Sequence, residues 1–127
     1  MMVRAGDRAT NLHALWDGML GSDESWENVS QTAHRIAEAH PRSEFAAEIH
    51  AVTFHRWMES SAERAKSIVY MEGALPFLTR QELNQDRTRA VPELPAGYMD
   101  RAHRTSETCA ALAAYRLADR LNDWLGQ

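Results

Sequence analysis

The sequence predicts an all-α protein with about four to five helices. Apolar residues recur three and four positions apart over most of the 127 residues, which is the spacing of one helix face. Glycine and proline are both missing between residues 42 and 72, so no helix breaker interrupts this stretch. The chain shows no internal repeat and no low-complexity tract, and its length suits one domain.

The first helix is expected to begin at Thr10 or Asn11, either of which can cap it, and to run to about Leu20. Its apolar stripe has the spacing of one helix face and consists of Leu12, Leu15, Trp16 and Met19. Before this helix, Val3 can end a strand and Gly6-Asp7 is typical of a turn.

The second helix is expected from about Glu24 to His40, after a helix stop at Gly21. Pro41 ends it, because a residue that precedes proline is pushed out of the α region. From Arg42 to Glu72, two rows of apolar residues predict one long central helix that packs on more than one neighbour.

The remaining chain holds a short helix and a long one. After the breakers Gly73 and Pro76, the sequence at 79–82 matches a capping box and starts the short helix. Residues 91–97 contain prolines and form a connector. The last helix is expected from about Tyr98 to Leu125, and small residues along its stripe would let another helix approach closely.

The charge balance argues against a simple nucleic-acid-binding surface. A net charge of −4 gives no electrostatic case for tight binding to a phosphate backbone. The net charge does not exclude an enzyme that binds phosphate through metal cations, because the count from the sequence omits the charge of those cations. The longest uncharged run, residues 108–115, is far too short to span a membrane, and the first residues lack an apolar segment of signal-peptide length.

Cys109 is the one cysteine, so no disulfide can form within the chain. It lies among alanines on a helix face that we expect to be buried, which predicts an inert thiol. The tryptophans fall on apolar helix faces and are expected in the core: Trp16, Trp26, Trp57 and Trp124.

His13 and Asp17 are four residues apart, so both side chains emerge from the same face of the first helix and are candidate metal ligands. The spacing alone is weak evidence, because it recurs at His34/Glu38, His40/Glu44, His55/Glu59 and His103/Glu107. A solvated ion pair is the usual explanation for such a pair. Zinc also needs about three protein ligands at a catalytic site, and no HExxH motif or cysteine pair supplies them.

The residues around this pair carry more information than its spacing. The segment 10–17, Thr-Asn-Leu-His-Ala-Leu-Trp-Asp, resembles the Asn-Leu-His-x-x-Trp-Asp motif of zinc-dependent single-strand nucleases. This family includes mung bean nuclease and the plant bifunctional endonucleases, and it is related to bacterial zinc phospholipase C. Residues 57–60 resemble its Trp-Ala-x-Glu-Ser motif, and residues 113–122 resemble its closing Ala-Gly-Tyr-Arg-Leu-Ala-x-x-Leu-Asn helix. Gly6-Asp7-Arg8 also fits the segment before the first motif.

The resemblance implies a helical domain of the zinc phospholipase C/nuclease type with a three-zinc cluster. His13 and Asp17 would be ligands of one zinc, while Glu59, Ser60 and the closing helix would be structural. The zinc-bound hydroxide would hydrolyse phosphodiesters of single-stranded DNA or RNA to 5′-phosphate products, and 3′-nucleotidase activity is common in the family. No residue of this chain is assigned a catalytic role beyond binding metal.

The chain also departs from the family pattern. Family members begin with a tryptophan that itself ligates zinc, followed by several His and Asp ligands, and these are missing here. Residues 1–127 are therefore expected to be the C-terminal part of a single zinc-dependent nuclease-like domain, with at most a partial zinc site. Arg8 and Met19 stand where family members often carry aromatics that stack bases, which leaves base preference open.

Other interpretations stay open at this point. The chain could be a catalytically inactive helical remnant, or a phospholipase C-like phosphoesterase, and we favour no independent catalysis by the chain on its own. An exposed apolar face is expected and could drive homodimerisation. A secreted or periplasmic location is expected for a full-length parent only, because family members are usually exported.

Overall fold

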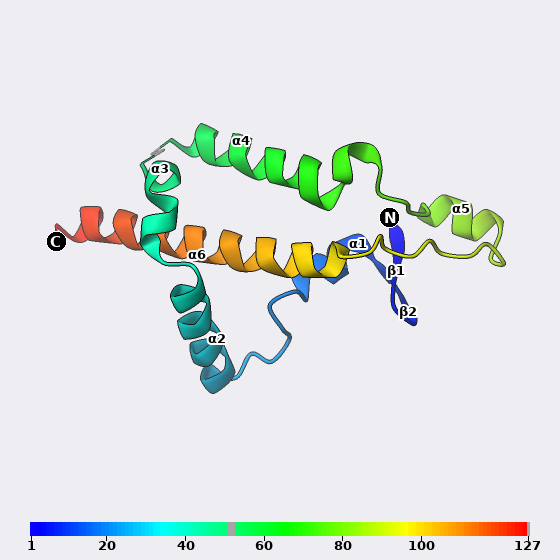
Figure 1. Ribbon diagram of the computed structural model, residues 1–127, viewed down its shortest axis with the longest axis horizontal. Helices are drawn as coiled ribbons and strands as arrows, with labels where there is room; N and C mark the ends of the chain where they lie inside the picture. The colour runs from blue at the N-terminus through cyan, green and yellow to red at the C-terminus, as the bar shows by residue number, and fades with distance from the viewer. Residues whose placement is uncertain (51–52, 127) are drawn as a thin grey trace. The chain divides into compact units, whose positions relative to one another are not determined.

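The computed structural model describes residues 1–50 and 53–126. The chain divides into two compact units with the following bounds: unit 1, Met1–Met19 and Ala62–His103; unit 2, Leu20–Ser61 and Arg104–Gln127. Figure 1 shows the course of the helices and of one short hairpin, and the predicted all-α class is confirmed. Helices α4 (Phe54–Arg64) and α6 (Tyr98–Leu125) each contribute residues to both units.

Unit 1 begins with an antiparallel hairpin of β1 (Met2–Ala5) and β2 (Arg8–Asn11). Gly6 occupies its turn with φ of +58°, a conformation that glycine adopts without strain. The amide of Met2 also donates to the carbonyl of Leu78 at 2.7 Å, which ties the hairpin to a later segment of the unit. The predicted turn and a strand at Val3 are present, but the strand ends at Ala5 and not at Val3, and the sequence did not predict β2.

The core of unit 1 gathers around the first turn of α6. Its buried members are Val3, Leu12, Met19, Leu75, Tyr98 and Ala102. Leu15 and Trp16 pack against this cluster from α1 (Leu12–Asp17), which ends earlier than the predicted Leu20. The predicted capping box is present at Thr79 and Glu82, and it begins α5 (Arg80–Gln85).

Unit 2 is built on α2 (Trp26–Ala39) and the part of α6 that follows His103. Residue His40 leaves the helical region with φ of −129° and ψ of 71°, as expected before Pro41. The 3₁₀ turn η1 (Arg42–Phe45) and the short α3 (Ala46–Ile49) follow. The core residues of this unit come from all of these elements: Ile36, Phe45, Ile49, Ala111 and Leu112.

The prediction of one long helix from Arg42 to Glu72 is wrong. The stretch contains η1, α3 and α4, then the π-helical turn η2 (Ala65–Val69) and the 3₁₀ turn η3 (Met71–Gly73). Part of it, residues 51–52, lies outside the described residues. The apolar residues of the stretch do not form one buried face: Phe45 is buried in unit 2 and Val69 packs in unit 1, whereas Phe54 and Met58 are exposed.

Two of the four tryptophan predictions and the predicted burial of Cys109 are also wrong. Trp26 and Trp124 are 84% and 86% exposed, and Cys109 is exposed as well. Trp16 packs against the unit 1 core and Trp57 is half-buried. Helical spacing shows which face is apolar, but it does not show whether a neighbouring element covers that face.

An exposed apolar face is present on the C-terminal half of α6, where Leu117, Leu121, Trp124 and Leu125 all face solvent.

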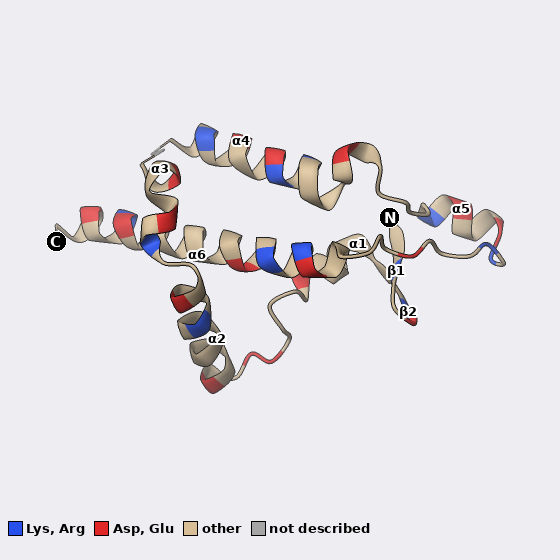
Figure 2. Ribbon diagram, viewed as in Figure 1, with Lys and Arg blue, Asp and Glu red and all other residues tan. Residues whose placement is uncertain are grey.

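Figure 2 shows acidic and basic residues interspersed along the helices of each unit. Over residues 1–50 and 53–126, no helix is both long enough and apolar enough to cross a bilayer.

Candidate metal centre

The candidate metal centre lies on α1, whose start is fixed by Asn11. The side-chain oxygen of Asn11 accepts a hydrogen bond of 2.7 Å from the amide of Ala14, which is the standard arrangement of a helix N-cap. Leu12 follows directly and is buried in the core of unit 1. The cap and the buried leucine together set where the helix begins and which face points inward.

Trp16 anchors the other end of the motif. Its indole N–H donates to the Tyr98 hydroxyl at 3.0 Å, and that hydroxyl donates to the carbonyl of Val69 at 2.9 Å. The two rings meet edge to face with their centroids 6.3 Å apart. Burial raises the pKa of Tyr98, so its hydroxyl keeps its proton at neutral pH and can donate to the carbonyl.

His13 and Asp17 point away from this core. Their side chains are 90% and 64% exposed, and Nε2 of His13 lies 3.3 Å from Oδ2 of Asp17. Zinc bonds of about 2.0–2.1 Å at the tetrahedral angle place neighbouring donor atoms about 3.3 Å apart. An imidazole nitrogen and a carboxylate oxygen are also donor types that zinc accepts. The distance between the two donor atoms is therefore compatible with two corners of a zinc site.

The same distance occurs in a pair outside the motif. Nε2 of His55 lies 3.2 Å from Oε1 of Glu59, and both side chains are exposed. His40 and Glu44 are 3.7 Å apart at their nearest atoms. Geometry alone does not separate His13/Asp17 from these pairs, so the surrounding motif carries the assignment.

A complete zinc site needs more ligands than this pair. Among residues 1–50 and 53–126, no group of three or more His, Cys, Asp or Glu side chains is placed to hold one metal ion. The described residues therefore supply no complete zinc site around His13 and Asp17, and no catalytic step follows from these two residues alone.

Hollows flank α1 within unit 1. One of about 330 Å³, the His13 hollow, is lined by His13, Trp16 and Tyr70 among others. Another of about 550 Å³, the Arg8 hollow, is lined by residues that include Arg8 and Met19. Arg8 and Met19 thus line the same hollow, which the sequence spacing did not reveal.

The sequence did not predict two polar residues of these hollows. Tyr70 lies in the His13 hollow, and His103 lies in the Arg8 hollow. Tyr70 follows η2 and His103 lies in the second turn of α6, so both are distant from α1 along the chain. No local sequence signal links them to the motif, because their proximity to α1 arises from the tertiary fold.

The helical fold and the exposed His–Asp pair are features expected of a metal-dependent hydrolase of the kind that the sequence resembles. A family model described as S1/P1 Nuclease matches residues 1–126. Because the match covers nearly the whole chain, the protein belongs to the S1/P1 nuclease family, a family of metal-dependent nucleases. Searches of curated proteins and of solved structures gave no match.

Proposed function

We propose that His13 and Asp17 hold one zinc ion of a nuclease that hydrolyses single-stranded DNA or RNA to products with 5′-phosphates. A 3′-nucleotidase activity would use the same metal. The observation that carries the proposal is the exposed pair at 3.3 Å, presented by a helix that Asn11 caps and Trp16 anchors. The family of the chain supports the nuclease class.

In this proposal, residues 1–127 are the C-terminal part of one nuclease-like domain, and the other zinc ligands belong to a further segment. A zinc cluster would lower the pKa of a bound water and stabilise charge on the phosphate during in-line attack. In this cluster, His13 would supply a neutral imidazole and Asp17 a carboxylate. Both must be deprotonated to bind, so zinc binding weakens as the pH falls.

The Arg8 hollow bears on the substrate. A guanidinium binds phosphate oxygens through several N–H donors, whereas an aromatic ring at this position would stack on a base. The exposed Arg8 side chain therefore favours a substrate held by its phosphate, such as a nucleic-acid strand or a nucleotide.

The first test is zinc stoichiometry. The chain is dialysed to equilibrium against buffered zinc and the metal it binds is measured by mass spectrometry, because two ligands hold zinc too weakly to survive a desalting column. Wild type is expected to bind zinc, and His13→Ala and Asp17→Ala are expected to bind less. His55→Ala is the matched control, because His55/Glu59 has the same spacing and nearly the same distance. Equal zinc in wild type and His13→Ala would overturn the assignment.

The second test is a substrate panel of single-stranded DNA, RNA, duplex DNA and phosphatidylcholine vesicles. Cleavage of single strands that needs zinc and His13 supports the proposal. Because the described residues supply only part of a zinc site, we expect no cleavage by the chain alone. Activity should rise when a segment with the remaining ligands is added. Lipid hydrolysis would favour the phosphoesterase alternative, and no activity even with that segment would favour an inactive remnant.

A further inference from the structure

Unit 2 contains a hollow of about 240 Å³, the Trp57 hollow, with an aromatic ring and arginines in its wall. The guanidinium carbon of Arg116 lies 5.1 Å from the centroid of the Trp57 ring, and that of Arg120 lies 5.7 Å from it. Both distances are within the range of cation–π contacts, about 6 Å. One half-buried indole thus holds the guanidinium groups of both arginines.

Arg116 and Arg120 are one helical turn apart on α6, so two like charges are held close together. Such a pair destabilises a helix unless other groups compensate the charge. Arg116 is further fixed by a hydrogen bond of 3.1 Å from its Nη2 to the backbone carbonyl of Glu48. These contacts hold the guanidinium groups in place, so an anion that contacts them would meet donors that are already ordered.

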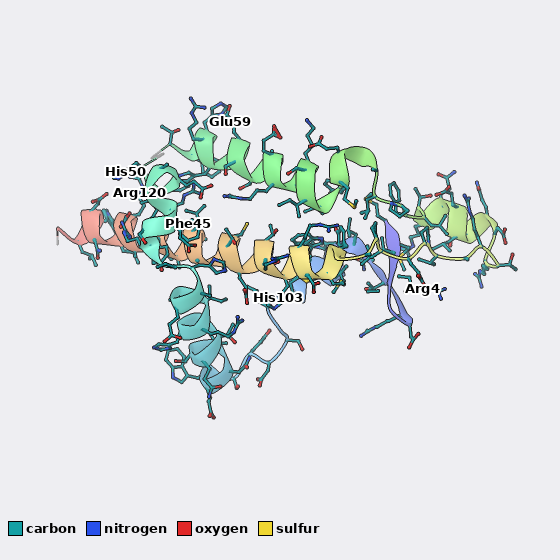
Figure 3. All side chains as sticks on the ribbon, viewed as in Figure 1. Arg4, Phe45, His50, Glu59, His103 and Arg120 are labelled. Carbon is teal, nitrogen blue, oxygen red and sulfur yellow. The ribbon has the colours of Figure 1, made fainter. Side chains whose placement is uncertain are left out.

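Further polar and charged side chains line the same hollow. Figure 3 labels His50 at the end of α3 and Arg120 on α6, and both line the cavity. Arg42 also lines it, with its Nη2 2.7 Å from each carboxylate oxygen of Asp119, so these two charges cancel locally. Asp123 is a further lining carboxylate and opposes an anion. The formal charges of the side chains that line the hollow therefore sum to a positive value. Removing a single charge would change this sum appreciably.

The contact with Trp57 is compatible with binding an oxyanion. A guanidinium contacts a ring through its flat face, while its N–H donors lie in its plane and point sideways. Phosphate oxygens fit these in-plane N–H donors because they accept two parallel hydrogen bonds from one guanidinium. Trp57 itself is covered by both arginines, so the ligand chemistry favoured here is a phosphoryl group and not a base stacked on the ring.

We propose that Trp57, Arg116 and Arg120 form a phosphate-binding site in unit 2. Its ligand is a phosphodiester of a single-stranded nucleic acid or the phosphate of a nucleotide. The choice of these ligands rests on the proposed nuclease function, whereas the site itself needs no metal. The site would hold a strand through its backbone, so it would not discriminate between base sequences.

The test measures binding of a fluorescein-labelled oligothymidylate by anisotropy, at low salt and with EDTA present. Arg120→Gln is expected to weaken binding several-fold and to reduce the slope of log affinity against log salt by about 0.7, the value for one single-strand phosphate contact. Asp123→Asn is expected to tighten binding. Arg56→Gln is the matched control, because Arg56 is an exposed arginine of α4 that pairs with Glu59.

Opposite effects of the two hollow variants distinguish binding from a purely structural role, and circular dichroism checks that each variant folds. Arg120→Gln binding like Arg56→Gln, or Asp123→Asn failing to tighten binding, would overturn the proposal. Inorganic phosphate and 5′-AMP serve as competitors. Displacement by either supports a phosphoryl site, stronger displacement by 5′-AMP identifies a nucleotide as the preferred ligand, and no displacement overturns it. Zinc stoichiometry is unaffected by any of these outcomes, so this site and the proposed nuclease function fail separately.

Discussion

The indole N–H of Trp16 donates a hydrogen bond of 3.0 Å to the hydroxyl of Tyr98, and this contact ties α1 to the first turn of α6. Tyr98 is almost fully buried, and its hydroxyl donates a hydrogen bond to the carbonyl of Val69. The candidate metal-binding motif thus has side chains that point into the core and side chains that point to solvent. Trp16 faces the core, while His13 and Asp17 face solvent.

Replacing Tyr98 by phenylalanine should destabilise unit 1. The change keeps the ring and removes the hydroxyl, which leaves the indole N–H of Trp16 and the carbonyl of Val69 without this partner. Loss of a buried hydrogen-bond partner costs about 1–3 kcal/mol in the free energy of unfolding. Urea denaturation followed by tryptophan fluorescence measures it. Tyr70→Phe is the control, because the Tyr70 side chain is exposed and should tolerate the change.

Replacing Asn11 by alanine should loosen the metal pair. The cap on Ala14 is lost, and such a loss costs about 1 kcal/mol of helix stability. Because α1 begins directly after Asn11, the first turn that carries His13 frays, and zinc should bind more weakly in calorimetric titration. Asn11→Ser keeps a side-chain acceptor and should retain most of the affinity. Equal zinc affinity in wild type and Asn11→Ala would contradict this account.

Local signals explain most of what the sequence predicted correctly. The cap at Asn11, the break at Pro41, the capping box at Thr79 and the long last helix each depend on residues close together in the chain. The candidate metal pair was found in the same way, because its two residues occupy one helical turn. Its status as a metal site depended on the neighbouring Asn11 and Trp16 of the motif.

Features that depend on tertiary contacts could not be predicted. The partner of Trp16 is Tyr98, 82 residues further along the chain, and no spacing rule links them. The stretch from Arg42 to Glu72 forms several helical segments, with Phe45 in the core of unit 2 and Val69 against the core of unit 1, although its composition suits one helix. Cys109 lies on an apolar helix face, yet it is exposed because no described element covers it.

Glu107 provides a prediction for unit 2. Its side chain is only 8% exposed, and it contacts Nη1 of Arg35 and lies 3.7 Å from Nε2 of His40. Glu107→Gln keeps the shape and removes the charge, which leaves the Arg35 guanidinium without its carboxylate partner. Because the Arg35 side chain is half exposed, water screens part of the loss, and we expect about 1–3 kcal/mol of destabilisation where a fully buried pair would lose more.

Urea denaturation at neutral pH measures this loss, and Glu38→Gln is the control because Glu38 is an exposed glutamate of α2. Both substitutions change one carboxylate to an amide, so they alter the net charge equally. Equal free energies of unfolding for the two variants would show that the contacts of Glu107 with Arg35 and His40 contribute nothing to folding.

Glu82 should make the stability of unit 1 depend on acidic pH. The backbone N–H and the hydroxyl of Thr79 donate to Oε2 of Glu82, each at 2.8 Å, and the Thr79 backbone bond is the main cause of the lowered Glu82 pKa, with Arg89 contributing less. A lowered pKa in the folded state means that the stabilisation is fully present above the ordinary pKa of about 4.3. It is lost as the pH falls through the folded-state pKa.

Thermal unfolding of wild type and Glu82→Gln between about pH 3 and pH 7 tests this dependence. The midpoint of wild type should fall more steeply below the ordinary glutamate pKa, because the amide introduced by Glu82→Gln still accepts a hydrogen bond but does not titrate. Thr79→Ala should flatten the profile in part, since it removes the hydroxyl donor and keeps the backbone donor. Parallel pH profiles for wild type and Glu82→Gln would mean that the capping box stabilises α5 without contributing to the acid sensitivity of the protein.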